Sequence, residues 1–398
     1  MSSDSPESRP HLFAAASALL IAGLALAAAL IYGDQLERRY IHALAPEFTE
    51  SKLQGVVLQK RAVEQPDLLV LYGSSELVRE VPNHASQFFQ DFPSGFRVFP
   101  IGKAGTTSLA VLQKVAAVGA DMQGRKVAFS ISPGWFLSEV FDPQFYEGNF
   151  SRMQAAELAF STDLSRELKR DIARRMLEFP KTLRDDWVLD CGLERLAGDT
   201  PLDRAIFAML RPMGFLETSL ARVQDHIEAA LHIMDEDDRF SEPVPKRGLR
   251  ALNWNRILRG AAFWANATTL RAKKQEVAKR RVSREKSILN GVAHAKEWSD
   301  IELLLRTFKE LGAQPLLLSM PIEDIRLEAY GASPMARTNY INRLDALADR
   351  YDFTLLDFHE YQKDPGFLAD FLDHLSEKGW LYYNKALDDF FHGRTSRL

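Results

Sequence analysis

Cysteine is almost absent from this chain, since Cys191 is the only one among 398 residues. A single thiol cannot form an intrachain disulfide, and it cannot supply the paired thiolates of a structural zinc site. The nine histidines also lack the short H-x-x-x-H type of spacing that places two imidazoles on one metal. We therefore expect no disulfide framework, no metal site and no cofactor.

An excess of charge of one sign is also lacking. The 50 basic and 54 acidic residues leave a formal charge of −4. Proteins that bind nucleic acid through phosphate neutralisation present a basic face, so we expect no nucleic-acid partner. The remaining composition, with 46% apolar and 26% charged residues, is that of a globular protein with room for a large core.

One long hydrophobic run is present near the N-terminus. Leu12 to Tyr32 contains no charged residue, and as a helix it would rise by about 30 Å, the thickness of a hydrocarbon core. A cleaved signal peptide is the alternative, although its apolar region is usually only about 7–15 residues long. We predict one uncleaved membrane anchor. Arg9 lies before the run and Arg38 and Arg39 follow it, so charge counting does not fix the orientation.

Beyond this run, apolar segments of strand length alternate with helical patterns. Such alternation predicts a parallel sheet with right-handed crossovers. The predicted strands are Asp67–Gly73, Phe96–Gly102, Lys126–Ser132, Pro315–Met320 and Phe353–Asp357. The predicted helices beside them are Glu76–Phe89 (a helix or a helix and loop), Thr107–Met122, Asp300–Leu311, Ala336–Tyr351 and Ser376–Phe390.

A helical insertion divides this α/β pattern. Strand signals are almost missing from residues 153–299, where helices are predicted over Leu164–Leu183, Leu202–Met234 (interrupted at Pro212–Gly214) and Trp254–Leu289. The basic run Arg271–Lys286 is either a solvated face or a contact for anionic lipid or a phosphate-bearing polymer. The predicted organisation is a tail and anchor over 1–33, a connector over 34–65, an α/β domain formed by 66–152 and 300–398, and the insertion 153–299.

Residues typical of a serine nucleophile site occur at the two ends of the α/β domain. Ser75 lies on a Gly–Ser–Ser turn directly after the first strand, where parallel sheets expose catalytic side chains. His374 is the candidate general base. Asp370, four residues earlier, is the preferred partner for the imidazole, with Asp373 as the alternative. A tight turn with a helix-capping serine remains the structural alternative for Ser75.

Other residues are expected to complete the pocket. The backbone N–H groups of Ser75 and Gly105 are candidate oxyanion donors, because both follow strands that end at the same sheet edge. A phosphate-binding loop is the rival reading of the Gly105 segment, but its lysine is misplaced for that motif. Ser74, Glu76 and the Trp135 turn are expected to wall the pocket, although Trp135 could instead fill the core.

Four segments together resemble the DltD family of D-alanyl-lipoteichoic acid biosynthesis proteins, which are membrane-anchored members of the SGNH (GDSL-like) hydrolase group. These are the GSSEL turn, the G-x-x-G-T-T segment at Gly102, the SPGWF strand end and the HLSEKGW close. The resemblance covers roughly residues 65–145 and 300–395. It matches Ser75, Gly105 and His374 to the serine, glycine and histidine of the family's blocks.

The resemblance implies an SGNH-like, flavodoxin-like three-layer α/β/α domain on the outer side of the cytoplasmic membrane, after a single membrane span. It implies a serine-dependent D-alanyl transferase or thioesterase that works with a membrane-bound O-acyltransferase and a D-alanyl carrier system on an envelope glycopolymer. The sequence departs from the SGNH pattern at Phe371, where an aspartate is usual, and at Pro133–Gly134–Trp135, where secreted esterases carry an asparagine. A non-catalytic scaffold and an extracytoplasmic esterase therefore remain alternatives.

Overall fold

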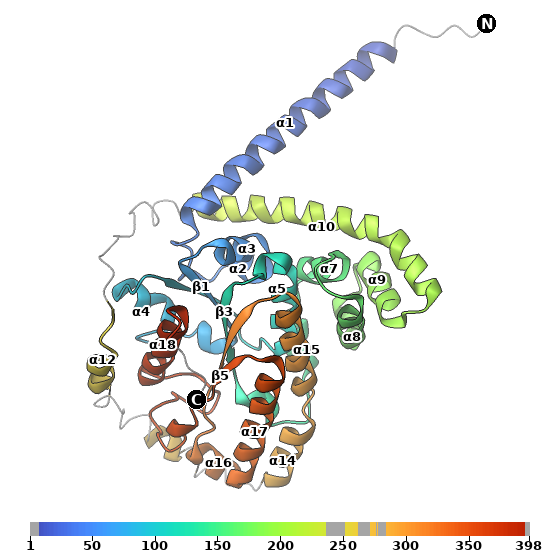
Figure 1. Cartoon of the computed structure of the whole chain (residues 1–398). Coiled ribbons are helices and arrows are strands. Elements are labelled where there is room, and N and C mark those ends of the chain that lie inside the picture. Colours follow the sequence, from blue (N-terminus) through green and yellow to red (C-terminus); the bar gives the residue numbers. More distant parts are fainter. Residues whose placement is uncertain (1–7, 236–250, 262–270, 276, 278–283, 395–398) are drawn as a thin grey trace, which may run out of the picture.

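Five parallel strands form the centre of the molecule. The computed structural model describes residues 8–235, 251–261, 271–275, 277 and 284–394 (Figure 1). The strands lie in the order β2-β1-β3-β4-β5, so the predicted α/β class is confirmed. The order reverses between β1 and β3, the point at which open parallel sheets place their sites. Their bounds are β1 (Leu68–Gly73), β2 (Arg97–Gly102), β3 (Lys126–Ile131), β4 (Gln314–Ser319) and β5 (Thr354–Leu356).

Helices cover both faces of the sheet, which explains why the strands are apolar throughout. In β1, Leu68, Val70 and Tyr72 pack into one hydrophobic cluster, while Leu69 and Leu71 pack into the other. The first cluster includes α3 (Val57–Glu64), α5 (Ser108–Val118), α15 (Glu297–Glu310) and α17 (Pro334–Tyr351); the second includes α4 (Ala85–Asp91), α12 (Trp254–Ala261) and α18 (Glu377–Phe391).

A helical region connects β3 to β4. Its described helices are α6 (Pro143–Glu147), α7 (Arg152–Phe160), α8 (Arg166–Met176), α9 (Trp187–Gly198), α10 (Pro201–Asp235), α12 and α14 (Glu285–His294). The predicted helix over Leu164–Leu183 is too long, because α8 ends at Met176 and a 3-10 turn follows at Pro180. Parts of the predicted helix Trp254–Leu289 and of the basic run Arg271–Lys286 lie outside the described residues.

The remaining short elements connect these layers. They are α2 (Glu50–Gln54), α16 (Asp324–Tyr330) and the 3-10 helices η1 (Ser75–Leu77), η2 (Gly119–Met122), η3 (Pro133–Phe136), η4 (Pro180–Thr182) and η6 (His359–Tyr361).

The interruption predicted within α10 is wrong, because one helix runs through Pro212 to Asp235. A proline inside a helix removes one backbone hydrogen bond, so tertiary packing must hold the chain in place. Gly214 provides such packing. A β-carbon there would lie 2.4 Å from the ring of Phe160, which stacks on Phe207 of the same helix.

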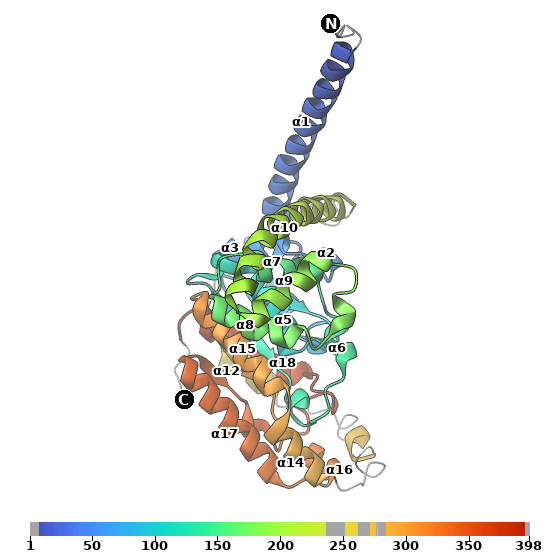
Figure 2. The ribbon, with the colours of Figure 1, turned by 90° about the vertical axis from the view of Figure 1, so that its right-hand side faces the viewer.

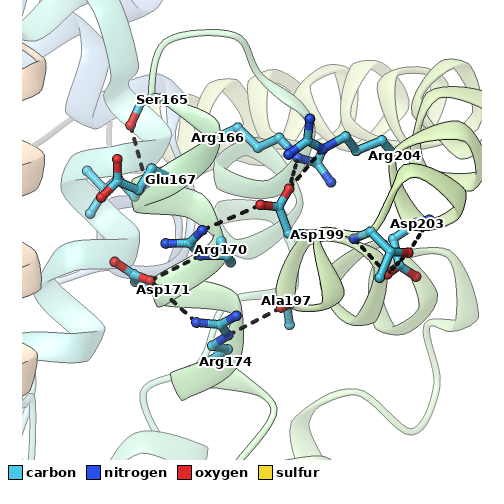
Figure 3. A network of polar contacts seen from close by, with 12 residues as sticks. Ser165, Arg166, Glu167, Arg170, Asp171, Arg174, Ala197, Asp199, Asp203 and Arg204 are labelled. Atoms are coloured by element: carbon cyan, nitrogen blue, oxygen red, sulfur yellow. Dashed lines mark hydrogen bonds and ion pairs between the residues drawn. The ribbon is translucent and has the colours of Figure 1, made fainter.

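Charged contacts fasten the start of α10 to α8 and α9 (Figure 3). Asp199, directly after α9, accepts hydrogen bonds from Arg166 at 2.9 Å and Arg204 at 3.1 Å. These two guanidinium groups hold the pKa of Asp199 well below its usual range. Asp203 pairs with Arg195 at 2.9 Å and joins the same helices. The position of α10 is therefore set by specific polar contacts.

The N-terminal helix α1 (Ser8–Tyr40) extends away from this body (Figures 1 and 2). Residues 11–29 are exposed, and Gly33 is its first buried residue. The segment His11–Tyr40 is long and apolar enough to cross a membrane. The predicted connector over 34–65 contains the end of α1, a turn in which Ile41 and Leu44 are buried, and the helices α2 and α3.

Candidate functional site

The chain leaves β1 through a turn that only glycine permits at its start. A β-carbon on Gly73 would lie 2.3 Å from Oε1 of Glu76 and 2.9 Å from Leu77. Ser75 then begins the 3-10 turn η1. The turn therefore places the Ser75 side chain at the carboxyl end of β1, next to the point where the strand order reverses.

A second loop carries the histidine to the same place. The loop is closed by the bridge between Leu368 and Leu375 and by the bond from the Ala369 N–H to the His374 carbonyl at 2.7 Å. Asp370 accepts the Leu372 N–H at 2.8 Å within this loop. These bonds lie within the loop, so they hold the aspartate and the histidine relative to each other without a contribution from the serine.

Ser75, His374 and Asp370 form one hydrogen-bonded chain. Nε2 of His374 lies 2.9 Å from Oγ of Ser75, and Nδ1 lies 2.8 Å from Oδ2 of Asp370. With Nδ1 protonated toward the carboxylate, Nε2 is free to accept the serine proton. The sequence analysis proposed these three residues from their types and their order along the chain. In the structure they lie within hydrogen-bonding distance of one another.

Arg79 adds a positive charge to this chain, and the sequence analysis missed it. Its guanidinium lies 2.5 Å from Oδ2 of Asp370 and 3.0 Å from Nδ1 of His374. Partial burial raises the pKa of Asp370, but hydrogen bonds from His374, the Leu372 N–H and Arg79 outweigh it and hold the pKa well below its usual range. The carboxylate is therefore ionised at neutral pH. The signal in the sequence was a basic residue four positions after Ser75, close enough along the chain to reach the same site.

Asp373, the alternative partner for the histidine, has a different set of contacts. Its backbone adopts a left-handed conformation with φ of 61°. Its carboxylate accepts Ser132 Oγ at 2.6 Å and the Gly134 N–H at 2.7 Å, and it pairs with buried Arg326. The alternative assignment is thus not supported, because the reversed backbone turns Asp373 toward the β3 turn while Asp370 turns toward the ring.

Glu76 does not wall the pocket as expected. Its side chain is 2% exposed, and it folds back beneath the turn to accept the Ser74 N–H at 2.9 Å. Burial raises the pKa of Glu76 to about 7. Ser74 is itself 4% exposed, so it supports the turn from below and does not line an open wall. Within this turn only Ser75 keeps a partly exposed side chain, while the flanking residues Ser74, Glu76 and Leu77 are buried.

The candidate oxyanion loop follows β2 and lies against the turn. Ser74 Oγ donates weakly to the Lys103 carbonyl at 3.4 Å. Gly105 has a φ of 80°, which favours glycine, and a β-carbon there would lie 2.7 Å from the ring of Phe145. Because the loop and Ser75 share one sheet edge, the backbone N–H of Gly105 remains a candidate donor.

The Trp135 turn lies beside this loop. The Trp135 ring meets the Phe145 ring at a centroid distance of 4.8 Å, and both line a cavity of about 230 Å³ that also includes Gly134 and Glu297. Asp373 ties this turn to the loop of the neighbouring His374 through the Gly134 N–H. The ring therefore borders open space, as a wall residue would, and its contact with a substrate stays a prediction.

No group of metal-ligating side chains surrounds Ser75 within the described residues. The described cluster with suitable spacing is Asp357, His359 and Glu360, on an exposed turn after β5. Exposed acidic groups of this kind are common without a metal.

Comparisons with known proteins agree on one family. The family model described as DltD protein matches residues 45–392. The chain is 27% identical to Protein DltD of Bacillus subtilis (strain 168), with 94% of this chain and 95% of that protein covered. It is 24% identical to Protein DltD of Staphylococcus aureus, with 87% and 86% covered, and 23% identical to Protein DltD of Lacticaseibacillus rhamnosus, with 94% and 89% covered.

Proposed function

Since this chain belongs to the DltD family, we propose that it transfers D-alanyl groups onto a cell-envelope polymer as a membrane-anchored serine acyltransferase. The observation that carries the proposal is the hydrogen-bonded chain from Ser75 through His374 to Asp370. An isolated serine is a weak nucleophile, and a neighbouring base with an oriented ring is what activates it.

In the first step, Ser75 Oγ attacks the carbonyl carbon of a D-alanyl ester or thioester while Nε2 of His374 takes the hydroxyl proton. The tetrahedral oxyanion is stabilised by backbone N–H groups of Ser75 and Gly105. Collapse of this intermediate breaks the bond to the leaving alcohol or thiol, which receives the proton from His374. The product is a D-alanyl ester on Ser75.

In the second step, a hydroxyl group of the polymer takes the place of the leaving group. His374 removes its proton, the hydroxyl oxygen attacks the acyl carbon, and Ser75 leaves with the proton returned. Throughout, the Asp370 carboxylate holds the ring and stabilises the imidazolium. One oxyanion donor fewer than in secreted esterases would cost on the order of 3 kcal/mol of transition-state stabilisation. That loss slows attack by water and by the polymer hydroxyl alike, so weak free hydrolysis is expected and efficient transfer depends on an acceptor hydroxyl held in position.

The apolar helix α1 anchors the protein in the membrane, with the α/β body on the extracytoplasmic side. The donor is then supplied by a membrane-bound O-acyltransferase and a D-alanyl carrier system. This arrangement is supported by the exposure of every residue from 11 to 29 and by the family membership. A protein fixed at the surface meets both a membrane-bound donor and an envelope polymer without diffusing away.

Two measurements test the proposal. A fluorophosphonate probe should label the full-length protein at Ser75, and the Ser75→Ala variant should stay unlabelled. In the source cells, Ser75→Ala should abolish D-alanyl ester in the envelope while the membrane level of the protein is unchanged. As a matched control, Ser299→Ala removes an exposed serine hydroxyl that bonds locally to the Lys296 carbonyl, and it should preserve both labelling and ester content.

Other outcomes overturn the proposal in distinct ways. An unlabelled Ser75, together with full ester content in the alanine variant, indicates a scaffold whose serine is not used. Rapid hydrolysis of a simple aryl acetate without any effect on D-alanyl ester indicates an esterase for which water is the acceptor.

A further inference from the structure

Helix α10 has its apolar side on the outside. Its buried residues are small or polar for the most part: Asp203, Phe207, Gly214, Thr218, Asp225, Ala229 and Ile233. Apart from Phe207 and Ile233, most of its large apolar residues are exposed. We call eight of them the outer stripe: Leu202, Met209, Met213, Leu216, Leu220, Ile227, Leu231 and Met234.

The outer stripe is continuous along the helix. At about 100° per residue, its eight members fall within a sector of about 60°, and no other residue of α10 falls in that sector. The centre of the sector lies roughly opposite the buried face. A soluble helix normally turns such a stripe toward the core, so this one is built to meet another apolar medium.

Polar contacts on the other sides of α10 prevent the helix from rotating to bury the outer stripe against the body. Asp225 accepts the N–H groups of Val56 and Val57 at 2.7 and 2.8 Å, which caps α3. Arg222 forms an ion pair with Glu157 of α7. Burying the stripe against the body would break these bonds and leave buried polar groups unpaired.

Helix α1 shows which medium the stripe meets. The two helices touch where α1 stops being exposed: a β-carbon on Gly33 would lie 3.5 Å from Cβ of Ala230. His226 Nδ1 bonds Glu37 at 2.6 Å one turn further along α1. Figures 1 and 2 both show α1 leaving the body on the side where α10 lies. The exposed apolar surface of α1 is therefore continuous with the outer stripe, whose Leu231 adjoins the contact.

We propose that α10 lies in the surface layer of the bilayer that α1 crosses, with the outer stripe buried among the lipids. An amphipathic helix with one apolar face and a polar opposite face binds at this depth, parallel to the membrane plane. The inference rests on the proposed anchoring of α1. It adds a second membrane contact, which fixes the orientation of the body and so the height of the Ser75 site above the lipid.

The test uses full-length protein in phospholipid nanodiscs without any partner. In a Cys191→Ala background, single cysteines replace Leu220, Leu231, Leu24 in the anchor and exposed Glu167 on α8, and each is labelled with an NBD fluorophore. All four positions are exposed, so the labels do not disturb the core. Lipids with a shallow doxyl quencher should reduce the emission at Leu220→Cys and Leu231→Cys at least twofold and leave Glu167→Cys unchanged.

The label at Leu24 separates the two possible failures. If Leu24→Cys is protected from water and quenched by a deep doxyl lipid while both stripe labels stay in water, the anchor stands and the interfacial helix is wrong. The interfacial helix is also wrong if the two stripe labels become shielded only after a membrane-protein partner is added. If Leu24→Cys itself stays in water, the proposed anchor fails, and the inference fails with it.

Discussion

Ser75 and His374 are 299 positions apart in the chain, and the serine Oγ lies 2.9 Å from Nε2 of the imidazole. Two loops at the carboxyl ends of the sheet bring them together. Each loop is fixed by its own backbone bonds, so the contact depends on the sheet and not on a flexible approach. Four predictions follow from the groups around this contact.

The two aspartates should respond differently to the same substitution. Asp370→Asn should lower acyl transfer roughly 10³–10⁴-fold, because the amide no longer holds the required tautomer, with little change in unfolding free energy. Asp373→Asn should instead cost about 3 kcal/mol of stability, because it leaves buried Arg326 without its carboxylate. Fluorophosphonate labelling rates and chemical denaturation of both variants check this. A catalytic loss confined to Asp373→Asn would reverse the assignment.

Arg79→Gln should lower the acyl-transfer rate, because the guanidinium lies 2.5 Å from Oδ2 of Asp370 and helps to hold that carboxylate in its ionised form beside the ring. Because Arg79 is partly exposed, the expected loss is about two- to fivefold. The measurement is the fluorophosphonate labelling rate at neutral pH. Arg350→Gln, which removes an exposed ion pair with Glu302, serves as the control and should leave the rate unchanged.

Glu76→Gln should change how stability depends on pH. The folded pKa of about 7 lies above the ordinary value of 4.5, so the unfolded chain loses its proton first. The contribution of the Glu76 carboxyl to the free energy of unfolding is therefore largest below pH 4.5. It decreases as the pH rises toward 7. Glutamine keeps the acceptor for the Ser74 N–H and cannot ionise. The variant should gain up to about 3 kcal/mol relative to the native chain above pH 7.

The measurement is the unfolding free energy of both chains at several pH values between 4 and 8. Glu167→Gln, at an exposed position, should follow the native curve. Parallel curves for the native chain and Glu76→Gln would show that the buried carboxyl is already ionised in this range.

Gly73→Ala should damage the site as well as the fold. The added β-carbon would meet Oε1 of Glu76 at 2.3 Å and must displace the turn that carries Ser75. We expect a loss of about 2 kcal/mol and a labelling rate at least tenfold lower. Gly260→Ala, which has open space around it, should be neutral or slightly stabilising. A full labelling rate in Gly73→Ala would show that the turn adapts without moving the serine.

Much of the fold could be predicted from the sequence, because strands and helices produce local patterns of apolar residues. Apolar runs bounded by turns identified all five strands, and β1 and β3 match them to within a residue or two. The same logic failed at Pro212, where propensity predicts a break and the packing of Gly214 on Phe160 maintains the helix. The burial of residues 34–65 could not be read from their own sequence, since it depends on partners far along the chain such as Asp225, which caps α3.

By itself the sequence determined the sheet, the apolar N-terminal helix and the serine, histidine and aspartate candidates, since each follows from neighbouring residues. Only the tertiary structure brought the Asp370 carboxylate to the imidazole and turned that of Asp373 toward Arg326, because the backbone of Asp373 is left-handed. It alone brought Arg79 to the carboxylate and buried Glu76 beneath the turn. It also turned the apolar side of α10 outward, because polar contacts on its other sides oppose the usual burial of such a stripe.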